Sequence, residues 1–276
     1  MKLIDGKALA QKIRGEIKEK IAMLEKEIGL AVILVGEDPA SQIYVRNKIR
    51  ACEEVGITSY SYILSKDATQ EELEGLIDRL ATDDKVHGIL LQLPLPKKFN
   101  SESALKKIPF KKDVDGFSAE NLGRLAKNEK CSVACTPYGV MKILEAEGID
   151  VAGKRAVVLG RSETVGKPMA LLLLNANATV TICHSRTKDL AEICKQADIL
   201  VSAIGKPKFV NADMVKDGAV VIDIGINRDE SGKLCGDVDF ENVKEKVSHI
   251  TPVPGGVGPM TITMLMYNTY LAALED

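Results

Sequence analysis

A tyrosine and a lysine stand four residues apart in a stretch whose pattern predicts a helix. Tyr44 and Lys48 therefore project from one face of that helix. An aromatic ring beside an amine offers a stacking surface together with a proton-transfer group. An ordinary helix-surface contact would have the same spacing, so the pair does not identify a catalytic site by itself.

Two further polar groups lie where α/β proteins bind ligands. Gln92 ends an apolar run and is followed by Leu93-Pro94-Leu95-Pro96, and ligands gather beyond the carboxyl ends of parallel strands. The segment Lys112-Asp113-Val114-Asp115-Gly116 places two carboxylates beside a glycine turn. Alternatively, Gln92 satisfies loop backbone groups, and one carboxylate caps the structure that follows.

An apolar strand, a glycine turn and a helix follow one another at Gly160-Arg161-Ser162 and Gly166. This order is typical of dinucleotide folds, where backbone N–H groups and a helix N-terminus face a pyrophosphate. The pattern is Gly-x-Ser-x-x-x-Gly rather than Gly-x-Gly-x-x-Gly. A turn that only packs the strand against the helix is therefore the alternative.

The next predicted strand, residues 179–183, ends in His184-Ser185-Arg186-Thr187 and brings no acid. Sites that prefer NAD usually place Asp or Glu about 20 residues beyond the glycines, to hold the ribose 2′-hydroxyl. Guanidinium and hydroxyl groups instead bind a 2′-phosphate through charge-assisted hydrogen bonds. We therefore expect NADP, selected by Arg161, Ser185 and Arg186, although these side chains can also be plain surface residues.

Residues 251–261 contain too much glycine and proline for a regular helix or strand. Such density suggests that the backbone approaches a ligand closely, with a plain loop as the alternative.

The elements that must position these residues alternate between helix and strand. Helices are predicted over Leu9–Ile28, 40–55, 136–148 and 259–274. Thr136 is the expected N-cap of the third of these. A further helix is predicted to begin at the capping box formed by Thr69 and Glu72. Strands are predicted over 30–35, 57–64, 86–92, 155–159, 179–183, 199–202 and 219–224. The alternation predicts two α/β domains with mainly parallel sheets, helices on both faces, and a carboxy-terminal domain of the Rossmann type.

A break in this alternation at residues 109–116 indicates a domain edge. We expect a first domain at 1–118, a connecting segment at 119–138 and a dinucleotide-binding domain at 139–258. The last helix, 259–276, is expected to pack back onto the first domain.

Composition narrows the class of protein. With 37 basic and 39 acidic residues among 276 and a net charge of −2, nothing indicates a general nucleic-acid or anionic-membrane partner. No uncharged apolar stretch is long enough to span a bilayer, and residues 1–14 lack a signal-peptide core. The six cysteines contain no Cys-x-x-Cys pair, which favours reduced thiols, no metal site and a cytoplasmic protein.

In this order, these segments resemble the methylenetetrahydrofolate dehydrogenase/methenyltetrahydrofolate cyclohydrolase family over nearly the whole chain. The matching segments are Ser41–Val45 with Lys48, Gln92–Pro96, Lys112–Gly116, Gly160–Ser162, Val221–Asn227 and Pro252–Thr261. The resemblance implies NADP-dependent oxidation of 5,10-methylenetetrahydrofolate to 5,10-methenyltetrahydrofolate, then hydrolysis to 10-formyltetrahydrofolate, in one-carbon metabolism. It also implies a homodimer in which each subunit has an active-site cleft between its two domains.

Position by position, the resemblance implies that Tyr44 stacks on the folate and that Lys48 is the main catalytic residue. It further implies that Gln92 orients Lys48 and that Asp115 binds the pterin. The resemblance implies that the dinucleotide is bound by Gly160, Arg161, Ser162, Ser185 and Ile226. It also implies that the folate cleft is lined by Pro254, Gly255 and Gly256. The assignment of Arg186 to the dinucleotide site depends only on its ability to bind a 2′-phosphate.

Two competing interpretations remain open. One is a dehydrogenase of the same family with little cyclohydrolase activity. The other is a non-catalytic NADP-binding sensor on the same fold, which would not need Lys48, Gln92 and Asp115 together. A generic hydroxy-acid or amino-acid dehydrogenase would need its own acid/base and carboxylate-binding residues, for which we find no independent pattern.

Overall fold

The computed structural model describes residues 1–275, apart from the side chain of Ala40. The chain divides into two compact units. We call residues 12–135 with 262–275 the three-stranded unit, and residues 1–11 with 136–261 the six-stranded unit. The division falls within helices α1 (Gly6–Ala22) and α10 (Val257–Ala273), so each of these helices contributes residues to both units.

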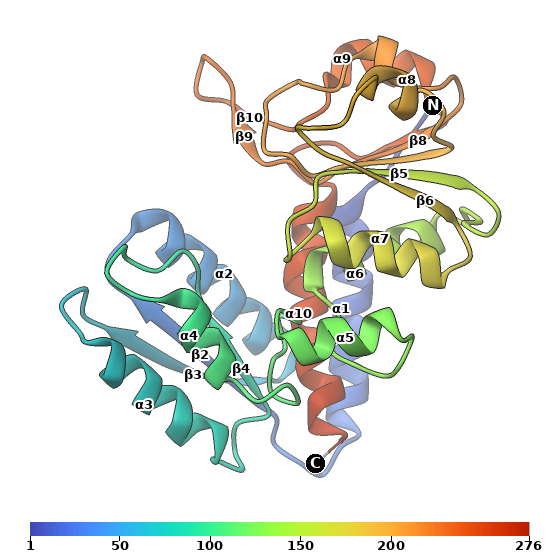
Figure 1. Cartoon of the computed structure of the whole chain (residues 1–276). Helices are drawn as coiled ribbons and strands as arrows, with labels where there is room; N and C mark the ends of the chain where they lie inside the picture. The colour runs from blue at the N-terminus through green and yellow to red at the C-terminus, as the bar shows by residue number, and fades with distance from the viewer. Residues whose placement is uncertain (276) are drawn as a thin grey trace. The chain divides into compact units, whose positions relative to one another are not determined.

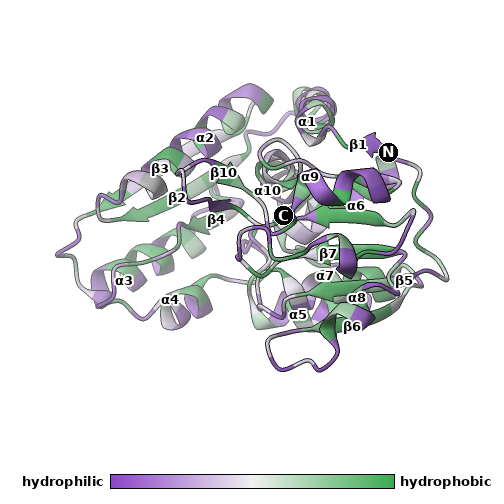
Figure 2. Cartoon of the chain, turned by 90° about the horizontal axis from the view of Figure 1, so that it is seen from above, coloured by the Kyte–Doolittle hydropathy of each residue, from purple (hydrophilic) through white to green (hydrophobic). Residues whose placement is uncertain are grey.

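The three-stranded unit is built on a parallel sheet with the order β3-β2-β4. Its strands are β2 (Gly29–Val35), β3 (Thr58–Leu64) and β4 (Gly88–Leu91), and its helices include α2 (Pro39–Val55), α3 (Gln70–Ala81), α4 (Ser101–Lys107) and α5 (Ala119–Ala126). Helices α2 and α3 lie on opposite faces of the sheet (Figures 1 and 2). Because the strands are parallel, their carboxyl ends share one edge, where Gly36, Ser65 and Gln92 begin the loops.

Helix α2 begins and ends where its local sequence requires. The Asp38 side chain accepts a hydrogen bond from the Ser41 N–H over 2.8 Å, and Pro39 occupies the first turn. Gly56 ends the helix in the left-handed region with φ of 86°. The helix predicted over 40–55 is thus confirmed.

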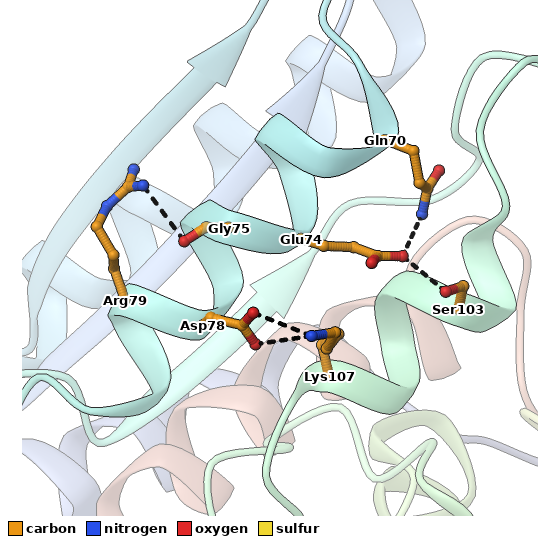
Figure 3. Close-up of polar contacts among 7 residues, drawn as sticks. All are labelled: Gln70, Glu74, Gly75, Asp78, Arg79, Ser103 and Lys107. Atoms are coloured by element: carbon orange, nitrogen blue, oxygen red, sulfur yellow. Dashed lines mark hydrogen bonds and ion pairs between the residues drawn. The ribbon is translucent and has the colours of Figure 1, made fainter.

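Helices α3 and α4 are tied together on one face of this sheet. The predicted capping box is present, because Thr69 and Glu72 satisfy each other's backbone N–H groups. Glu74 accepts hydrogen bonds from Gln70 and Ser103, and Lys107 pairs with Asp78 at 3.0 Å (Figure 3). These contacts hold the face of the unit that carries no expected site residue.

The six-stranded unit contains a parallel sheet with the order β1-β11-β8-β7-β5-β6. The strands are β1 (Lys2–Leu3), β5 (Arg155–Leu159), β6 (Thr179–Cys183), β7 (Ile199–Ser202), β8 (Val220–Asp223) and β11 (His249–Ile250). Around them lie α6 (Cys135–Ala146), α7 (Gly166–Asn175), α8 (Leu190–Cys194), α9 (Phe240–Val243), the turns η1 (Ala212–Met214) and η2 (Lys244–Lys246), and the hairpin β9 (Asn227–Arg228) with β10 (Leu234–Cys235).

Helices cover both faces of this sheet, as predicted, with α7 on one face and α8 and α9 on the other (Figure 1). The chain leaves β5 for β6 on one side and then returns to β7 on the other side of β5. In open α/β sheets such a reversal of strand order marks the ligand-binding crevice, beyond the carboxyl ends of the strands. Gly160, which follows β5, lies at this point.

Several predicted element ends differ from the structure. Helix α10 begins at Val257, inside the segment 251–261 that was predicted to be irregular, and β4 covers 88–91 rather than 86–92. The first helix ends at Ala22 rather than Ile28, because Ile28 is fully buried at the entry to β2 and its apolar spacing reflects that strand. Helix α6 begins at Cys135, so Thr136 lies inside the helix instead of capping it. The Thr136 hydroxyl instead pairs with that of Thr261 over 2.9 Å. The short strands β1, β9, β10 and β11 were not predicted, since two residues leave no periodicity to detect.

The apolar residues concentrate in the strands, whereas α2 and α3 carry hydrophilic residues as well (Figure 2). None of the helices within residues 1–275 combines the length and apolar character needed to cross a membrane. All six cysteines lie in the described part of the chain and are free thiols.

Candidate functional site

Lys48 on α2 and Gln92 after β4 are in direct contact. Lys48 Nζ donates a hydrogen bond to Gln92 Oε1 over 3.0 Å. Gln92 is largely buried, and its Nε2 donates to the Leu93 carbonyl oxygen over 2.6 Å, which turns its own oxygen toward the lysine. The Gln92 N–H also bonds the Ile33 carbonyl oxygen over 2.9 Å, continuing the pairing of β4 with β2. The sheet edge therefore gives the amine a fixed direction.

Tyr44 lies one helical turn before Lys48, with 46% of its surface exposed. Ser41 and Val45, which share another face of α2, are buried at 3% and 6% exposure. The helix is thus anchored by that buried face while the aromatic ring stays open to a ligand. This is the orientation that a stacking platform requires.

Asp115 belongs to the same unit and is electrostatically coupled to Lys48. Burial raises the pKa of Asp115 to about 6, the Lys48 charge opposes this rise, and Asp113 adds to it. An acid with this pKa is mostly ionised at pH 7 and above. The three-stranded unit therefore holds an amine, an amide and a carboxylate whose charges influence one another.

The neighbouring carboxylate, Asp113, shapes the loop that carries Asp115. Asp113 is 3% exposed and accepts hydrogen bonds from the backbone N–H groups of Gly116, Phe117 and Ser118, at 2.7–3.1 Å. It also accepts one from Asn121 Nδ2 over 2.9 Å. Of the two acids in this segment, Asp113 is the cap. The sequence allowed a cap but did not say which acid it was, and Asn121 was missed.

The glycine turn after β5 requires its glycines for steric reasons. Gly160 has φ of 124°, and a Cβ there would lie 2.3 Å from the Ala203 carbonyl oxygen. A Cβ on Gly166 would lie 2.3 Å from the Gly160 carbonyl oxygen. Close packing of the turn against neighbouring backbone is one property of the dinucleotide-binding turn.

Ser162 caps the helix that follows this turn. Its Oγ accepts hydrogen bonds from the N–H groups of Val165 and Gly166, both over 3.2 Å, and its carbonyl oxygen accepts one from Lys167. The serine that replaces the second glycine of the usual pattern thus satisfies N–H groups at the start of α7.

The three residues expected to select a 2′-phosphate are exposed. Arg161 follows β5, and Ser185 and Arg186 follow β6, its hydrogen-bonded neighbour. The loop after β6 is closed by His184, whose N–H bonds Thr187 Oγ1 over 2.9 Å and whose Nδ1 accepts the Arg186 N–H over 3.2 Å. Since β5 and β6 are adjacent and parallel, their carboxyl ends bring these residues to one end of the sheet.

Two buried carboxylates that the sequence interpretation missed organise the loops after β7 and β8. The donors to Asp237 are the N–H groups of Ile204, Gly205 and Lys206, the Ser202 hydroxyl and Asn227 Nδ2, at 2.7–3.3 Å. Asp223 accepts from the N–H groups of Gly225, Asp237 and Val238 at 2.8–3.0 Å. Burial raises the pKa of Asp223 to about 6, against these backbone donors. The loop held by this pair presents Ile226, which is 54% exposed.

A signal for these carboxylates was present in the glycines. A Cβ on Gly225 would lie 2.2 Å from Asp237 Oδ1, and one on Gly236 would lie 1.9 Å from Asp223 Oδ2. Gly225 and Gly236 are therefore glycines because a carboxylate of the protein, not a ligand, lies against their backbone.

The turn at Pro254-Gly255-Gly256 precedes α10 in the six-stranded unit. Gly255 has φ of 103° and its carbonyl oxygen accepts the Lys7 N–H over 3.0 Å. A Cβ on Gly6 would collide with the Gly256 carbonyl oxygen. Gly256 is buried and serves packing, whereas Pro254 is exposed.

The expected site residues thus form two sets. Tyr44, Lys48, Gln92 and Asp115 belong to the three-stranded unit, with Lys48 in contact with Gln92 and coupled to Asp115. The dinucleotide set and the 254–256 turn belong to the six-stranded unit. The exposed cations and hydroxyl after β5 and β6 fit a dinucleotide with a 2′-phosphate.

Two family models match the chain. Residues 4–115 match the family model for the tetrahydrofolate dehydrogenase/cyclohydrolase catalytic domain, and residues 134–276 match that for the NAD(P)-binding domain of the same family. The bifunctional protein FolD of Moorella thermoacetica is 57% identical over 274 residues, which cover 98% of each chain.

Solved structures give the same result. The bifunctional FolD enzyme of Campylobacter jejuni is 54% identical with a TM-score of 0.98, over 100% of this chain and 99% of that one. The Trypanosoma brucei dehydrogenase-cyclohydrolase, solved with NADP and an inhibitor, is 41% identical with a TM-score of 0.93, over 99% and 97%. The chain belongs to the tetrahydrofolate dehydrogenase/cyclohydrolase family.

Proposed function

We propose that this protein oxidises 5,10-methylenetetrahydrofolate to 5,10-methenyltetrahydrofolate with NADP, and then hydrolyses that product to 10-formyltetrahydrofolate. The observation that carries the proposal is the 3.0 Å hydrogen bond from Lys48 to Gln92, at a sheet edge where the Lys48 charge also reaches Asp115. The FolD enzyme of Campylobacter jejuni, whose name includes both a dehydrogenase and a cyclohydrolase, supports it. We keep residues 1–118 as the folate-binding domain and 139–258 as the NADP-binding domain.

Asp115 is the proposed anchor for the pterin. The amino-pyrimidine edge of a pterin presents neighbouring N–H donors, and an ionised carboxylate accepts two of them. The exposed ring of Tyr44 supplies a stacking surface for the same ligand. The turn at Pro254–Gly256 is proposed to line the folate site through its exposed proline and its backbone.

Oxidation of the methylene carbon depends mainly on alignment. NADP, when bound, accepts the hydride. Lone pairs on the two flanking folate nitrogens stabilise the resulting cation, so no side-chain base is required. The residues of the chain serve to align the folate with the dinucleotide. Gly160, Ser162 and Ile226 are proposed to hold the dinucleotide through the turn after β5 and the loop after β8.

Hydrolysis of the methenyl cation requires proton movement. Water adds to the cationic carbon and a C–N bond then opens. Both protons leave the water oxygen, which becomes the formyl oxygen: one proton reaches the departing nitrogen and the other is released to solvent. We assign this transfer to the Lys48 amine, which Gln92 orients through the hydrogen bond of 3.0 Å.

Preference for NADP is assigned to Arg161, Ser185 and Arg186. All three are exposed and follow the adjacent strands β5 and β6. Guanidinium and hydroxyl donors suit a phosphate, and a carboxylate in their place would repel it.

We further propose a homodimer formed through the edge strand β3. One side of β3 is unpaired, none of its residues is charged or a proline, and Ile63 is 72% exposed beside a groove between β3 and α3. Protein edges are usually protected by charge, proline or cover. A second copy related by a two-fold axis places the same strand against itself and covers both edges. A cytoplasmic location is also proposed, supported by the six free thiols.

Replacing Lys48 by Met tests the assignment of the two activities. Hydrolysis should fall by about 10²- to 10⁴-fold, the usual contribution of a general acid–base group, while hydride transfer is largely retained. Both stages are followed spectroscopically with methylenetetrahydrofolate and NADP. Arg50→Met, an exposed cation on the same helix, is the control and should leave both stages unchanged. Unaltered hydrolysis in Lys48→Met would remove the lysine from the mechanism, and absence of either wild-type activity would overturn the bifunctional proposal.

Alanine at Arg161 or Ser185 tests cofactor selection. Each substitution should raise KM for NADP by roughly tenfold, since one charge-assisted hydrogen bond is worth about 1.5 kcal/mol, and should change KM for NAD little. Lys195→Ala, at another exposed position of the same unit, should affect neither. Equal increases for the two dinucleotides would contradict a contact with the 2′-phosphate.

The raised pKa of Asp115 makes stability depend on pH. Folding favours the neutral form of Asp115. Its favourable contribution to the free energy of unfolding is therefore fully present below pH 3.8 and is lost as the pH rises through about 6. Asp115→Asn should therefore unfold with a free energy on the order of 2–3 kcal/mol higher than the wild type at pH 8, with little difference at pH 3.5. Urea titrations at both pH values measure this. A variant less stable than the wild type at pH 8 would show that the buried charge is not costly.

Ile63→Glu tests the dimer. A charge on each of two facing edges should convert the dimer to a monomer in sedimentation velocity runs. Ile182→Glu is the matched control, because Ile182 is 41% exposed on β6, the edge strand of the other sheet. Dissociation by the control instead, or a monomeric wild type, would reject the β3 interface.

A further inference from the structure

A buried asparagine in the last helix contacts the loop that carries Asp115. Asn268 on α10 is 2% exposed. Its Nδ2 donates to the carbonyl oxygens of Val114 and Val133, both over 2.8 Å, and lies 3.6 Å from Cys135 Sγ. Asn268 and these partners all belong to the three-stranded unit. One amide nitrogen therefore connects two separate segments of chain, residues 113–116 and residues 133–135.

The Val114 carbonyl has a second donor. The Cys135 thiol donates to the same oxygen over 3.3 Å. Burial raises the pKa of Cys135 well above its usual value, and the charge of Asp115 acts in the same direction, so the thiol keeps the proton that it donates. Two side chains thus fix the direction of one carbonyl group.

Fixing this carbonyl fixes the residue that follows. The carbonyl of Val114 and the nitrogen and Cα of Asp115 share one rigid peptide plane. On the other side of Asp115, the Gly116 N–H is bonded to Asp113 Oδ1 over 3.1 Å. Asp115 therefore lies between two anchored peptide groups, one held by Asn268 and the other by Asp113.

The two anchors also meet through the second segment. Gly116 has φ of 72°, and a Cβ there would lie 2.5 Å from the Val133 carbonyl carbon and the Ala134 nitrogen. Asn268 bonds the oxygen of that same Val133. The amide of Asn268 thus keeps the 133–135 segment pressed against the turn that follows Asp115.

We propose that Asn268 is a positioning residue for folate binding, which directs the Asp115 carboxylate by holding the Val114–Asp115 peptide plane. This inference rests on the proposed function, in which Asp115 binds the pterin. No part of Asn268 needs to touch the substrate, since its amide protons are both used within the protein. Helix α10 thereby becomes part of the folate site through a side chain 153 positions beyond Asp115.

The main test is Asn268→Ala, assayed for methylenetetrahydrofolate KM and for NADP Kd. Displacement of the carboxylate should raise the folate KM by roughly tenfold or more, as small misplacements at a site do. The NADP Kd, which depends on the other unit, should stay within about twofold, below 0.5 kcal/mol. Asn268→Ser retains one donor and should fall between the wild type and Asn268→Ala.

The pH dependence of folate binding gives a readout that loss of stability would not change. A loosened loop admits water to Asp115, so its pKa should move from about 6 toward the ordinary value of 3.8, and tight binding should extend to lower pH. Thr269→Val is the matched control. Thr269 is equally buried on α10, but its hydroxyl bonds only the Leu265 carbonyl oxygen, so its loss should lower stability without altering folate KM or its pH profile.

Cys135→Ala keeps the inference testable if Asn268→Ala does not fold. It removes only the second donor to Val114 and should raise folate KM by about two- to threefold, a loss of roughly 0.5 kcal/mol. Unchanged folate KM and pH profile in the folded Asn268 or Cys135 variants, with a large increase in Asp115→Asn, would overturn the positioning role and leave the proposed function intact. An unchanged KM in Asp115→Asn itself would instead remove Asp115 from the folate site, and the inference with it.

Discussion

Buried carboxylates that accept backbone N–H groups give both functional regions their shape. Parallel sheets bring polar loops together at the carboxyl ends of their strands, but a loop has no ladder of hydrogen bonds to hold it. Asp113 supplies this order in the loop between α4 and α5, by accepting three backbone N–H groups and the Asn121 amide. Asp237 and Asp223 supply it after β7 and β8. Such a carboxylate is stable when buried because its donors replace water.

This arrangement separates the residues that build the loops from those that the loops present. Asp113 is buried among the donors that bind its carboxylate, whereas burial raises the pKa of Asp115, two positions further on. Similarly, Asp237 is fully buried while Ile226 on the loop it holds is exposed. Residues proposed to bind ligands are thus supported by carboxylates, such as Asp113 and Asp237, that accept several hydrogen bonds within the loops.

Much of the fold and part of the site could be predicted from local sequence. Strands β2 to β8 and helix α2 follow from apolar runs and Gly56. The Lys48–Gln92 contact was expected from the family resemblance, and the structure contains it. What could not be predicted depends on distant pairing. Asp237 is recognisable only once β8 has brought Asp223 beside it, and Asn268 only once α10 reaches Val114. Ser162 was predicted to bind the dinucleotide, but its role as a cap for α7 required coordinates.

The interleaved chain path has a consequence for synthesis. Strand β1 pairs with β11, so Lys2 cannot pair in the sheet until His249 has been synthesised. The three-stranded unit likewise includes residues 262–275 and needs Asn268 to tie its loops. Neither half can reach its final form on the ribosome before nearly all of the 276 residues have been polymerised. Contacts of such long sequence separation slow folding, so for this chain the last helix completes both units rather than one.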